Sequence, residues 1–171
     1  MVTAWPESVE RVSSFLREAG AEARIEEFSD GTPTAAEAAA AVGCGLVQIV
    51  KSLVFLCDGR PVLALVPGDR RGDPTKVAAS SGASSARVAS ADEVEESTGF
   101  VPGAVAPFPL PRVDTVLIDR SLLRQTVVWA GAGSPRHMVG LAPAELARLS
   151  RARSVDVVSD PTYHSTRPEE R

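Results

Sequence analysis

The stretch LVQIVKSLVFLCDG, residues 46–59, is strongly apolar and carries one lysine near its middle. Most of positions 46–57 are aliphatic, aromatic or thiol side chains, several of them β-branched, and Asp58-Gly59 is a common hairpin pair. The pattern predicts a core strand over 46–57, a turn, and a second apolar strand over 61–66. Lys51 therefore falls inside a predicted core strand, and its charge needs a partner.

The composition of the chain indicates one globular domain. With 171 residues, of which 44% are hydrophobic, it can bury a core without disulfides or a structural metal. No run is long enough to span a membrane, and the N-terminus lacks the features of a secretory signal. Cys44 and Cys57 form neither a CxxC pair nor a zinc motif. We expect a cytoplasmic protein, with a domain over 1–158 and a polar tail over 159–171.

The charge of the chain limits its partners. A net charge of −4 argues against coating DNA or the body of an RNA, although one exposed nucleotide end needs only a few cations. Lys51 and Lys76 are the only lysines among 18 basic residues, so a chain that otherwise uses arginine places a lysine in its most apolar strand. Two readings stay open. Lys51 either packs along an edge strand with its ammonium in water, or reaches into a cleft to meet an anion.

Helix and strand signals alternate along the chain without a repeat. Capping boxes begin at Thr34 and Ser90, and Asp73-Pro74 is an N-cap followed by proline. Expected helices cover 7–19, 35–42, 74–81, 91–98 and 144–149, with a short one at 121–124. Further strands are expected at 21–28, 113–118, 126–130, 136–141 and 155–158. The order predicts a single α/β domain with a mixed sheet.

Three further features could belong to a site. The loop over 99–111 is rich in proline and glycine yet apolar, so we expect it to fold over a pocket or the core, where its backbone N–H groups could meet a ligand. The GAG at Gly131–Gly133 lacks the third glycine of a dinucleotide fingerprint and favours a tight turn or close approach to a ligand. His137 follows this turn, whereas His164 lies in the tail. We expect no metal site and no cofactor.

In this order, these segments resemble the YbaK/prolyl-tRNA-synthetase-associated editing domain family. The resemblance rests on VQIVKSLVFLCDGRPVLALVPGD, TKVA, ARVASADEVEESTGFVPGAVAPF, VLIDRSLL and VVWAGAG, and it runs from about residue 34 to 149. It implies a compact α/β domain with a mixed, partly barrel-like sheet flanked by short helices. It also implies hydrolysis of a wrong amino acid, of the alanine or cysteine class, from tRNA, most often proline tRNA. The expected partners are the aminoacyl 3′ end of tRNA and prolyl-tRNA synthetase.

The resemblance also assigns roles to residues. Lys51 matches the essential lysine of the family, which would hold the phosphate or sugar of the terminal adenosine. The G-x-x-x-P loop, which would place backbone amides around the aminoacyl group, is Gly103-Ala104-Val105-Ala106-Pro107. Further residues expected at the substrate are Thr34, Asp119, Gly131, Gly133 and His137. Because the loop has alanines where many members have glycine or serine, the preferred amino acid stays open.

The leading hypothesis is therefore a deacylase that acts in trans on aminoacyl-tRNA. A non-catalytic module that binds an aminoacyl end or a nucleotide is the alternative. A lysine Schiff-base enzyme finds no acid–base partner in the sequence.

Overall fold

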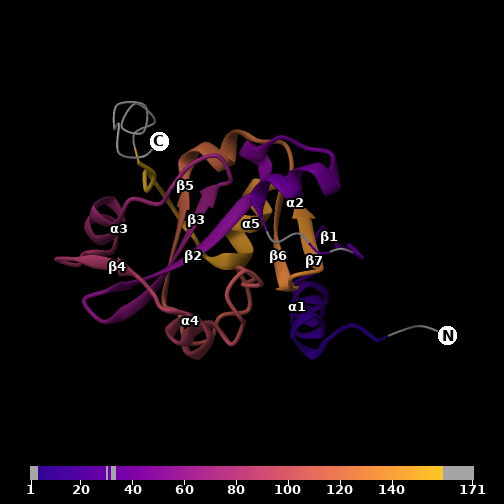
Figure 1. The fold of residues 1–171 in the computed structure, drawn as a ribbon, viewed down its shortest axis with the longest axis horizontal. Helices are drawn as coiled ribbons and strands as arrows, with labels where there is room; N and C mark the ends of the chain where they lie inside the picture. Colours follow the sequence, from indigo (N-terminus) through magenta and orange to yellow (C-terminus); the bar gives the residue numbers. More distant parts are fainter. Residues whose placement is uncertain (1–3, 30, 32–33, 160–171) are drawn as a thin grey trace.

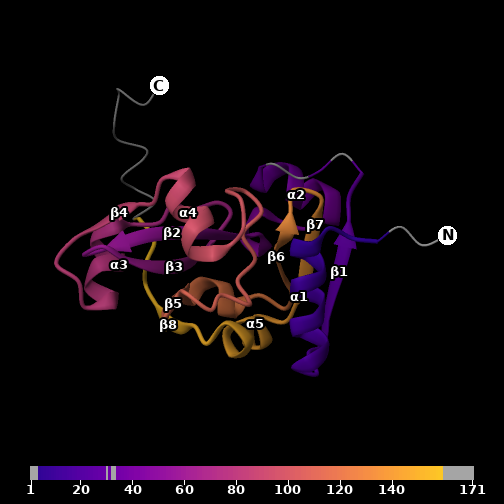
Figure 2. The same ribbon diagram turned by 90° about the horizontal axis from the view of Figure 1, so that it is seen from below.

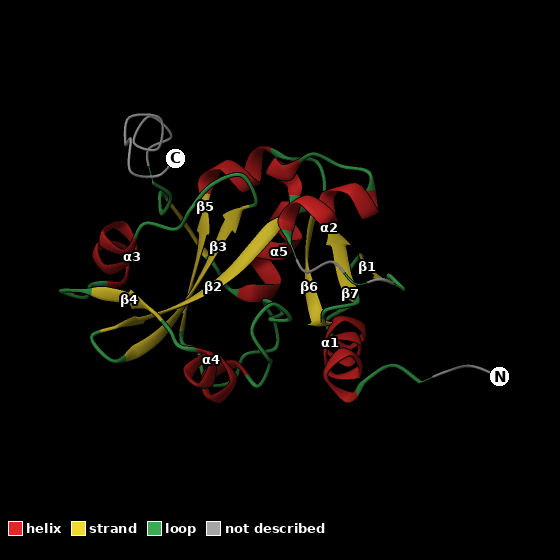
Figure 3. Ribbon diagram, in the orientation of Figure 1, coloured by secondary structure: helices red, strands yellow, loops and turns green. Residues whose placement is uncertain are grey.

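The computed structural model describes residues 4–29, 31 and 34–159, which form two sheets and five α-helices (Figure 1 and Figure 3). The five-stranded sheet has the order β4-β2-β3-β5-β8, with strands β4 (Ala86–Val88), β2 (Val50–Cys57), β3 (Arg60–Pro67), β5 (Thr115–Asp119) and β8 (Arg153–Val155). The three-stranded sheet has the order β1-β7-β6, with β1 (Ala23–Glu27), β7 (His137–Leu141) and β6 (Val128–Ser134). The helices are α1 (Glu7–Glu18), α2 (Ala35–Val42), α3 (Pro74–Ser81), α4 (Ala91–Thr98) and α5 (Pro143–Ser150), with 3₁₀ turns η1 (Leu46–Gln48) and η2 (Arg120–Arg124).

The larger sheet is mixed, as expected. β2 runs antiparallel to β3 and β4, whereas β5 is parallel to both β3 and β8. The smaller sheet is wholly antiparallel. The two sheets touch where Ile49, just before β2, makes a single bridge to Trp129 of β6. Neither sheet closes on itself, so the fold class is confirmed but the partly barrel-like form is not.

The main core lies between the two sheets. Alternate residues of β3 face opposite sides: Leu63 and Leu65 join this main core, whereas Ala64 and Val66 join a second cluster under Val77 of α3. The main core also receives side chains from α1, α4 and α5, and Figure 2 shows α1 beside the smaller sheet and α5 near β5 and β8. None of the helices in the described part of the chain has the length and apolar character that a membrane crossing needs.

Local signals place most helix ends where the sequence predicts them. Asp73 accepts hydrogen bonds from the N–H groups of Thr75 and Lys76 at the start of α3, and Ser90 and Glu93 form a reciprocal capping box on α4. Gly43, Gly82 and Gly99 end α2, α3 and α4 with positive φ. Each of these glycines reverses the chain at the end of its helix and so sets the direction of the loop that follows.

The structure corrects four details. Leu46–Gln48 is a 3₁₀ turn and not the start of the strand, because the N–H of Gln48 bonds to Gly45 and the Gly45 N–H bonds to the Gln48 side chain. Gly131–Gly133 is not a turn but the end of β6. The last strand lies at Arg153–Val155, earlier than expected, and the short strand β4 had no signal in the sequence. The tail from 160 onward, with His164, lies outside the described residues.

The glycines of β6 are required by neighbouring backbone. A Cβ on Gly131 would lie 2.9 Å from the carbonyl oxygen of Val105, and one on Gly133 would lie 2.7 Å from that of Ser8. Gly133 also has a φ of +104°, which L-residues with a side chain rarely adopt. The close approach expected for these glycines is therefore to the protein's own chain.

This packing gives a test with a matched control. Gly133→Ala should lower the free energy of unfolding by about 2–5 kcal/mol, because it adds a backbone clash to an unfavourable φ. Gly59→Ala has a similar φ of +82° but meets no atom within 4 Å. Gly59→Ala should therefore lose only about 1–2 kcal/mol. Urea denaturation of both variants measures the difference, and equal losses would show that the contact with Ser8 is unimportant.

Candidate functional site

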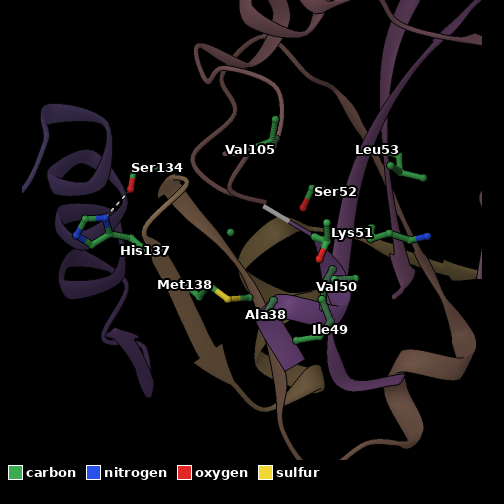
Figure 4. A pocket seen from close by; sticks show the side chains of 14 residues that line it. Ala38, Ile49, Val50, Lys51, Ser52, Leu53, Val105, Ser134, His137 and Met138 are labelled. Atoms are coloured by element: carbon green, nitrogen blue, oxygen red, sulfur yellow. Dashed lines mark hydrogen bonds between the residues drawn. The ribbon is translucent and has the colours of Figure 1, made fainter. Parts of the chain in front are cut away.

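A cavity of about 240 Å³ lies where the two sheets meet. Its wall combines α2, the first half of β2, the G-x-x-x-P loop and the β6–β7 hairpin (Figure 4). The lining residues are Thr34, Ala35, Ala38, Ile49, Val50, Lys51, Ser52, Leu53, Gly103, Val105, Gly131, Ser134, His137 and Met138. Six of the eleven positions predicted for the site therefore share one cavity, although they come from four separate segments.

The cavity exists because one edge of β2 is left partly uncovered. β4 has three residues and pairs only with Phe55–Cys57, so it ends before it reaches residues 50–53. On its other side β2 pairs along its whole length with β3. The unpaired half of β2 therefore faces the smaller sheet and borders the cavity.

Lys51 lies in the cavity wall, but its ammonium has a partner elsewhere. Nζ donates a hydrogen bond to the carbonyl oxygen of Arg70, and Figure 4 shows the side chain directed away from Ser134 and His137. Burial lowers the pKa of Lys51 below its ordinary value, the nearby guanidinium of Arg71 lowers it further, and Asp69 opposes both. The lysine is half-buried and anchored, so it is neither the free surface cation nor, in this conformation, a cation pointing into the cavity.

The G-x-x-x-P loop folds over the core, as expected. Ala104 and Ala106 are fully buried, and the carbonyl oxygen of Ala104 accepts the N–H of Gly133 at 3.1 Å. Gly103 and Val105 reach the cavity. Among the described residues, the backbone N–H of Val105 has no hydrogen-bond acceptor, which leaves it available to a ligand.

Thr34 and Gly131 both line the cavity. The hydroxyl of Thr34 accepts the N–H of Glu37 at 3.1 Å and so caps α2 while the residue also borders the cavity. Gly131 leaves room for the Val105 backbone to approach β6. Both residues shape the cavity through backbone geometry more than through reactive groups.

His137 contributes to the wall, but its imidazole is turned to the opposite face of the small sheet. Met138 packs with Ala38 of α2, and the side chain before it in β7 therefore faces α1, as Figure 4 shows. Nδ1 lies 2.5 Å from Ser134 Oγ, and Nε2 lies 3.1 Å from Glu27 Oε2 but without the alignment of a hydrogen bond. The ring is 2% exposed and meets Trp5 edge-on at 5.4 Å. Burial lowers the pKa of His137, and Glu27 partly offsets this effect.

Pro107, Asp119, Ala104, Ala106 and Gly133 lie outside the cavity wall. Pro107 borders a separate hollow of about 630 Å³ next to α1 and α5. The buried carboxylate of Asp119 accepts the N–H groups of Ser121, at 3.1 Å, and of Val157, at 3.0 Å, and also the Ser121 hydroxyl. Its bonds hold η2 and the segment after β8 against β5, which is a structural task.

Ser52 is the site residue that sequence reasoning missed. Its hydroxyl is buried, lies at the cavity and has no hydrogen-bond partner among the described residues. The signal in the sequence was the position of Ser52 directly after Lys51. Neighbouring side chains of a strand point to opposite faces, so this pair places one polar group on each face of an otherwise apolar strand. The Lys51 ammonium is hydrogen-bonded to Arg70, whereas the Ser52 hydroxyl has no partner among the described residues.

The chemistry of the cavity is that of a neutral binding site. The lining residues that the structure describes include no carboxylate, and their polar groups are hydroxyls and backbone groups, with the Lys51 ammonium held to one side. Such a site can orient an uncharged ester and hydrogen-bond to a developing negative charge through the N–H of Val105. In this conformation it offers no side chain placed as a general base.

Comparisons with known proteins show which proteins the chain is similar to. The family model for the aminoacyl-tRNA editing domain matches residues 29–149. The chain is 34% identical over 155 residues to the uncharacterized protein YwhH of Bacillus subtilis (strain 168), covering 90% of this chain and 98% of that protein. It is 36% identical over 138 residues, 80% of this chain, to a proline--tRNA ligase of Maridesulfovibrio salexigens, of which it spans only 24%. A crystal structure of a candidate trans-editing enzyme for prolyl tRNA synthetase superposes with a TM-score of 0.85 at 36% identity, covering 92% of this chain and all of that one.

The buried imidazole predicts a pH-dependent stability. Because the pKa of His137 is lowered in the folded state, the unfolded chain binds the proton more readily once the pH falls toward the ordinary value of about 6.5. The stability gained from a neutral His137 is therefore present above that pH and is lost as the pH falls through the lowered pKa.

Thermal unfolding between pH 7.5 and 5.5 tests this expectation. The melting temperature of the native chain should fall more than that of His137→Gln, which cannot take up the proton, while His164 contributes equally to both. Equal declines would contradict the assignment. An NMR titration checks it directly, since His137 should titrate below the ordinary value.

Proposed function

Because the chain belongs to the aminoacyl-tRNA editing domain family, we propose that it is an aminoacyl-tRNA deacylase that acts in trans. It hydrolyses the ester between a small wrong amino acid, of the alanine or cysteine class, and the 3′ end of a tRNA, with proline tRNA as the favoured carrier. Water adds to the ester carbonyl, the bond to the ribose oxygen breaks, and free amino acid and tRNA leave. The observation that carries the proposal is the cavity between β2 and the G-x-x-x-P loop, within the range that the family model matches.

The proposal agrees with the energetics of amino-acid selection. A synthetase pocket made for proline discriminates weakly against a smaller amino acid, because a missing methylene is worth only about 1–3 kcal/mol. A second, smaller site that hydrolyses what enters corrects the error. The cavity here is small and largely aliphatic, with Ala38, Val50 and Val105 in its wall, which suits a short side chain.

Hydrolysis at this site would depend on position more than on a strong base. An aminoacyl ester is already activated, so holding it beside a water molecule, or beside a group of the substrate itself, supplies much of the rate enhancement. The N–H of Val105 would stabilise negative charge on the ester carbonyl oxygen, which its lack of an acceptor among the described residues supports. Its neighbours Ala104 and Ala106 are buried and hold the loop in place.

Lys51 would bind the terminal phosphate at the rim of the cavity. Burial lowers the pKa of Lys51, and the nearby guanidinium of Arg71 lowers it further. A phosphate between these two cations would offset their repulsion. To reach that phosphate the ammonium exchanges its bond to the Arg70 carbonyl for one to the RNA. Arg71 and Lys51 would then form one cationic rim, and recognition stays at the single-stranded end, in keeping with a net charge of −4.

A binding module without turnover is the second candidate. It is favoured by two features: the described part of the cavity lining has no carboxylate, and the imidazole of His137 faces α1. Such a module would bind an aminoacyl end and release it unchanged. In both cases the partners we propose are the 3′ end of tRNA and prolyl-tRNA synthetase, in the cytoplasm.

Deacylation assays with matched lysine variants test the function. The native chain should release alanine or cysteine from mischarged proline tRNA faster than buffer does. Lys51→Ala should lower kcat/KM by about 100-fold or more, because a hydrogen-bonded charge contact to the phosphate is lost. Lys76→Ala removes the other lysine, which pairs with Asp156 at 3.0 Å on the surface, and should keep its activity.

The outcomes separate the two candidates. No release from alanyl-, cysteinyl- or seryl-tRNA, together with measurable binding of an aminoacyl end, would leave the binding module. Full activity of Lys51→Ala would refute the role of Lys51. Circular dichroism of both variants confirms that any loss is not caused by unfolding.

A further inference from the structure

The hydroxyl of Ser52 is a polar group that the fold buries and does not use. Its Oγ has no hydrogen-bond partner in the described part of the chain, although most buried side-chain hydroxyls in proteins have one. By contrast, the buried hydroxyls of Thr98 and Ser150 donate to the carbonyl oxygens of Val94 and Leu146, at 2.7 and 2.6 Å. An orphaned hydroxyl at a cavity therefore indicates that the missing partner is a ligand.

The backbone N–H and C=O groups of Ser52 also lie on the uncovered edge of β2. The carbonyl oxygen of Val54 points to the β4 side of β2, where it accepts a hydrogen bond from the N–H of Ala89 at 2.9 Å. Residues two apart in a strand present their backbone groups on the same side, so the N–H and C=O of Ser52 also face this side. Because β4 pairs only with Phe55–Cys57, no strand of that sheet meets them there. Ser52 thus brings three hydrogen-bonding groups to one edge of the cavity.

The surroundings decide which ligand group these atoms suit. The backbone N–H of Val105, which lines the same cavity, is a donor and suits a carbonyl oxygen. Of the lining residues that the structure describes, none is a carboxylate, so the acceptors that this wall offers to an ammonium are neutral oxygens. The Oγ and the carbonyl oxygen of Ser52 are two such acceptors on one residue, and neither has a hydrogen-bond partner within the described ranges of the chain.

We propose that Ser52 binds the α-ammonium group of the aminoacyl ester, through its hydroxyl and its backbone carbonyl oxygen. This inference rests on the proposed function for the identity of the substrate. The ester carbonyl then lies toward Val105, across the cavity, and the side chain of the amino acid lies against the aliphatic wall formed by Ala38 and Val50. Ser52 is thus the residue that distinguishes an aminoacyl group from an acyl group without an amine.

The test compares two esters that differ only in the amine. Alanyl-tRNA and lactyl-tRNA, obtained from it by deamination, are hydrolysed by the native chain and by Ser52→Ala. The variant should lose about 10- to 100-fold in kcat/KM on alanyl-tRNA, because a hydrogen bond to a charged group is removed, and less than twofold on lactyl-tRNA. An equal loss on both esters, or no loss on either, overturns the inference and leaves the proposed function intact.

A binding measurement separates this inference from the proposed activity. The amide-linked alanyl and propionyl derivatives of 3′-amino-3′-deoxyadenosine cannot be hydrolysed and differ only in the ammonium. The native chain should bind the alanyl derivative more tightly, and Ser52→Ala should abolish that difference. This result without any deacylation would refute the activity and retain Ser52. The absence of both binding and hydrolysis overturns both.

Stability provides the control for a merely structural serine. Ser52→Ala should melt no earlier than the native chain, because its hydroxyl makes no hydrogen bond to lose. Ser150→Ala should melt earlier, because it leaves the bond to Leu146 unmade, yet it should deacylate alanyl-tRNA normally since it lies far from the cavity wall. A clear drop in the melting temperature of Ser52→Ala would show that the hydroxyl has a partner within the fold, and would overturn the inference.

Discussion

The site depends on the mismatch in length between β2 and β4. β2 has eight residues and β4 has three, so the pairing covers Phe55–Cys57 and stops. The uncovered half of β2 would be a sheet edge open to association with other chains, which proteins usually shield. Here the smaller sheet, α2 and the G-x-x-x-P loop surround it, and the space that remains is the cavity. A strand edge that is enclosed but unpaired offers hydrogen-bonding groups in a partly dry setting, which is what a small polar ligand requires.

Local signals made much of the fold predictable. The capping residues Asp73 and Ser90 specify the starts of α3 and α4 through contacts within a few residues, and the continuous apolar run of β3 marks a buried strand; those predictions are confirmed. β4 was missed because three residues carry too little periodicity, and it is held by pairing with a strand some 30 positions earlier. The Gly131–Gly133 segment was misread because its glycines serve contacts with Val105 and Ser8, which are distant in sequence.

The location of the site was predictable from the sequence, but the directions of its side chains were not. The segments around Lys51, Gly103 and Gly131 do meet at one cavity. The sequence could not show that the Lys51 ammonium bonds to Arg70, or that the His137 ring lies on the α1 face, because a side chain's direction depends on register and on the start of each strand. The strand that carries Lys51 begins at Val50 and not at Leu46. The face on which the His137 imidazole lies follows from the register of β7, in which His137 pairs with Glu27 of β1. The resemblance thus predicted which segments meet at the cavity, whereas the register of each strand determines where its side chains point.

Gly133 links the N-terminal helix to the cavity loop. Its carbonyl oxygen accepts the hydroxyl of Ser8 at 2.7 Å, and its N–H donates to Ala104. The family model begins at residue 29, so α1 lies outside the matched range while its first turn braces the loop that carries Val105. An excised segment over 29–149 would therefore retain every wall residue of the cavity and lose the helix that supports its roof. The brace of the cavity loop therefore begins earlier than the range of the family model, and exchange of the domain between proteins would have to carry that helix along.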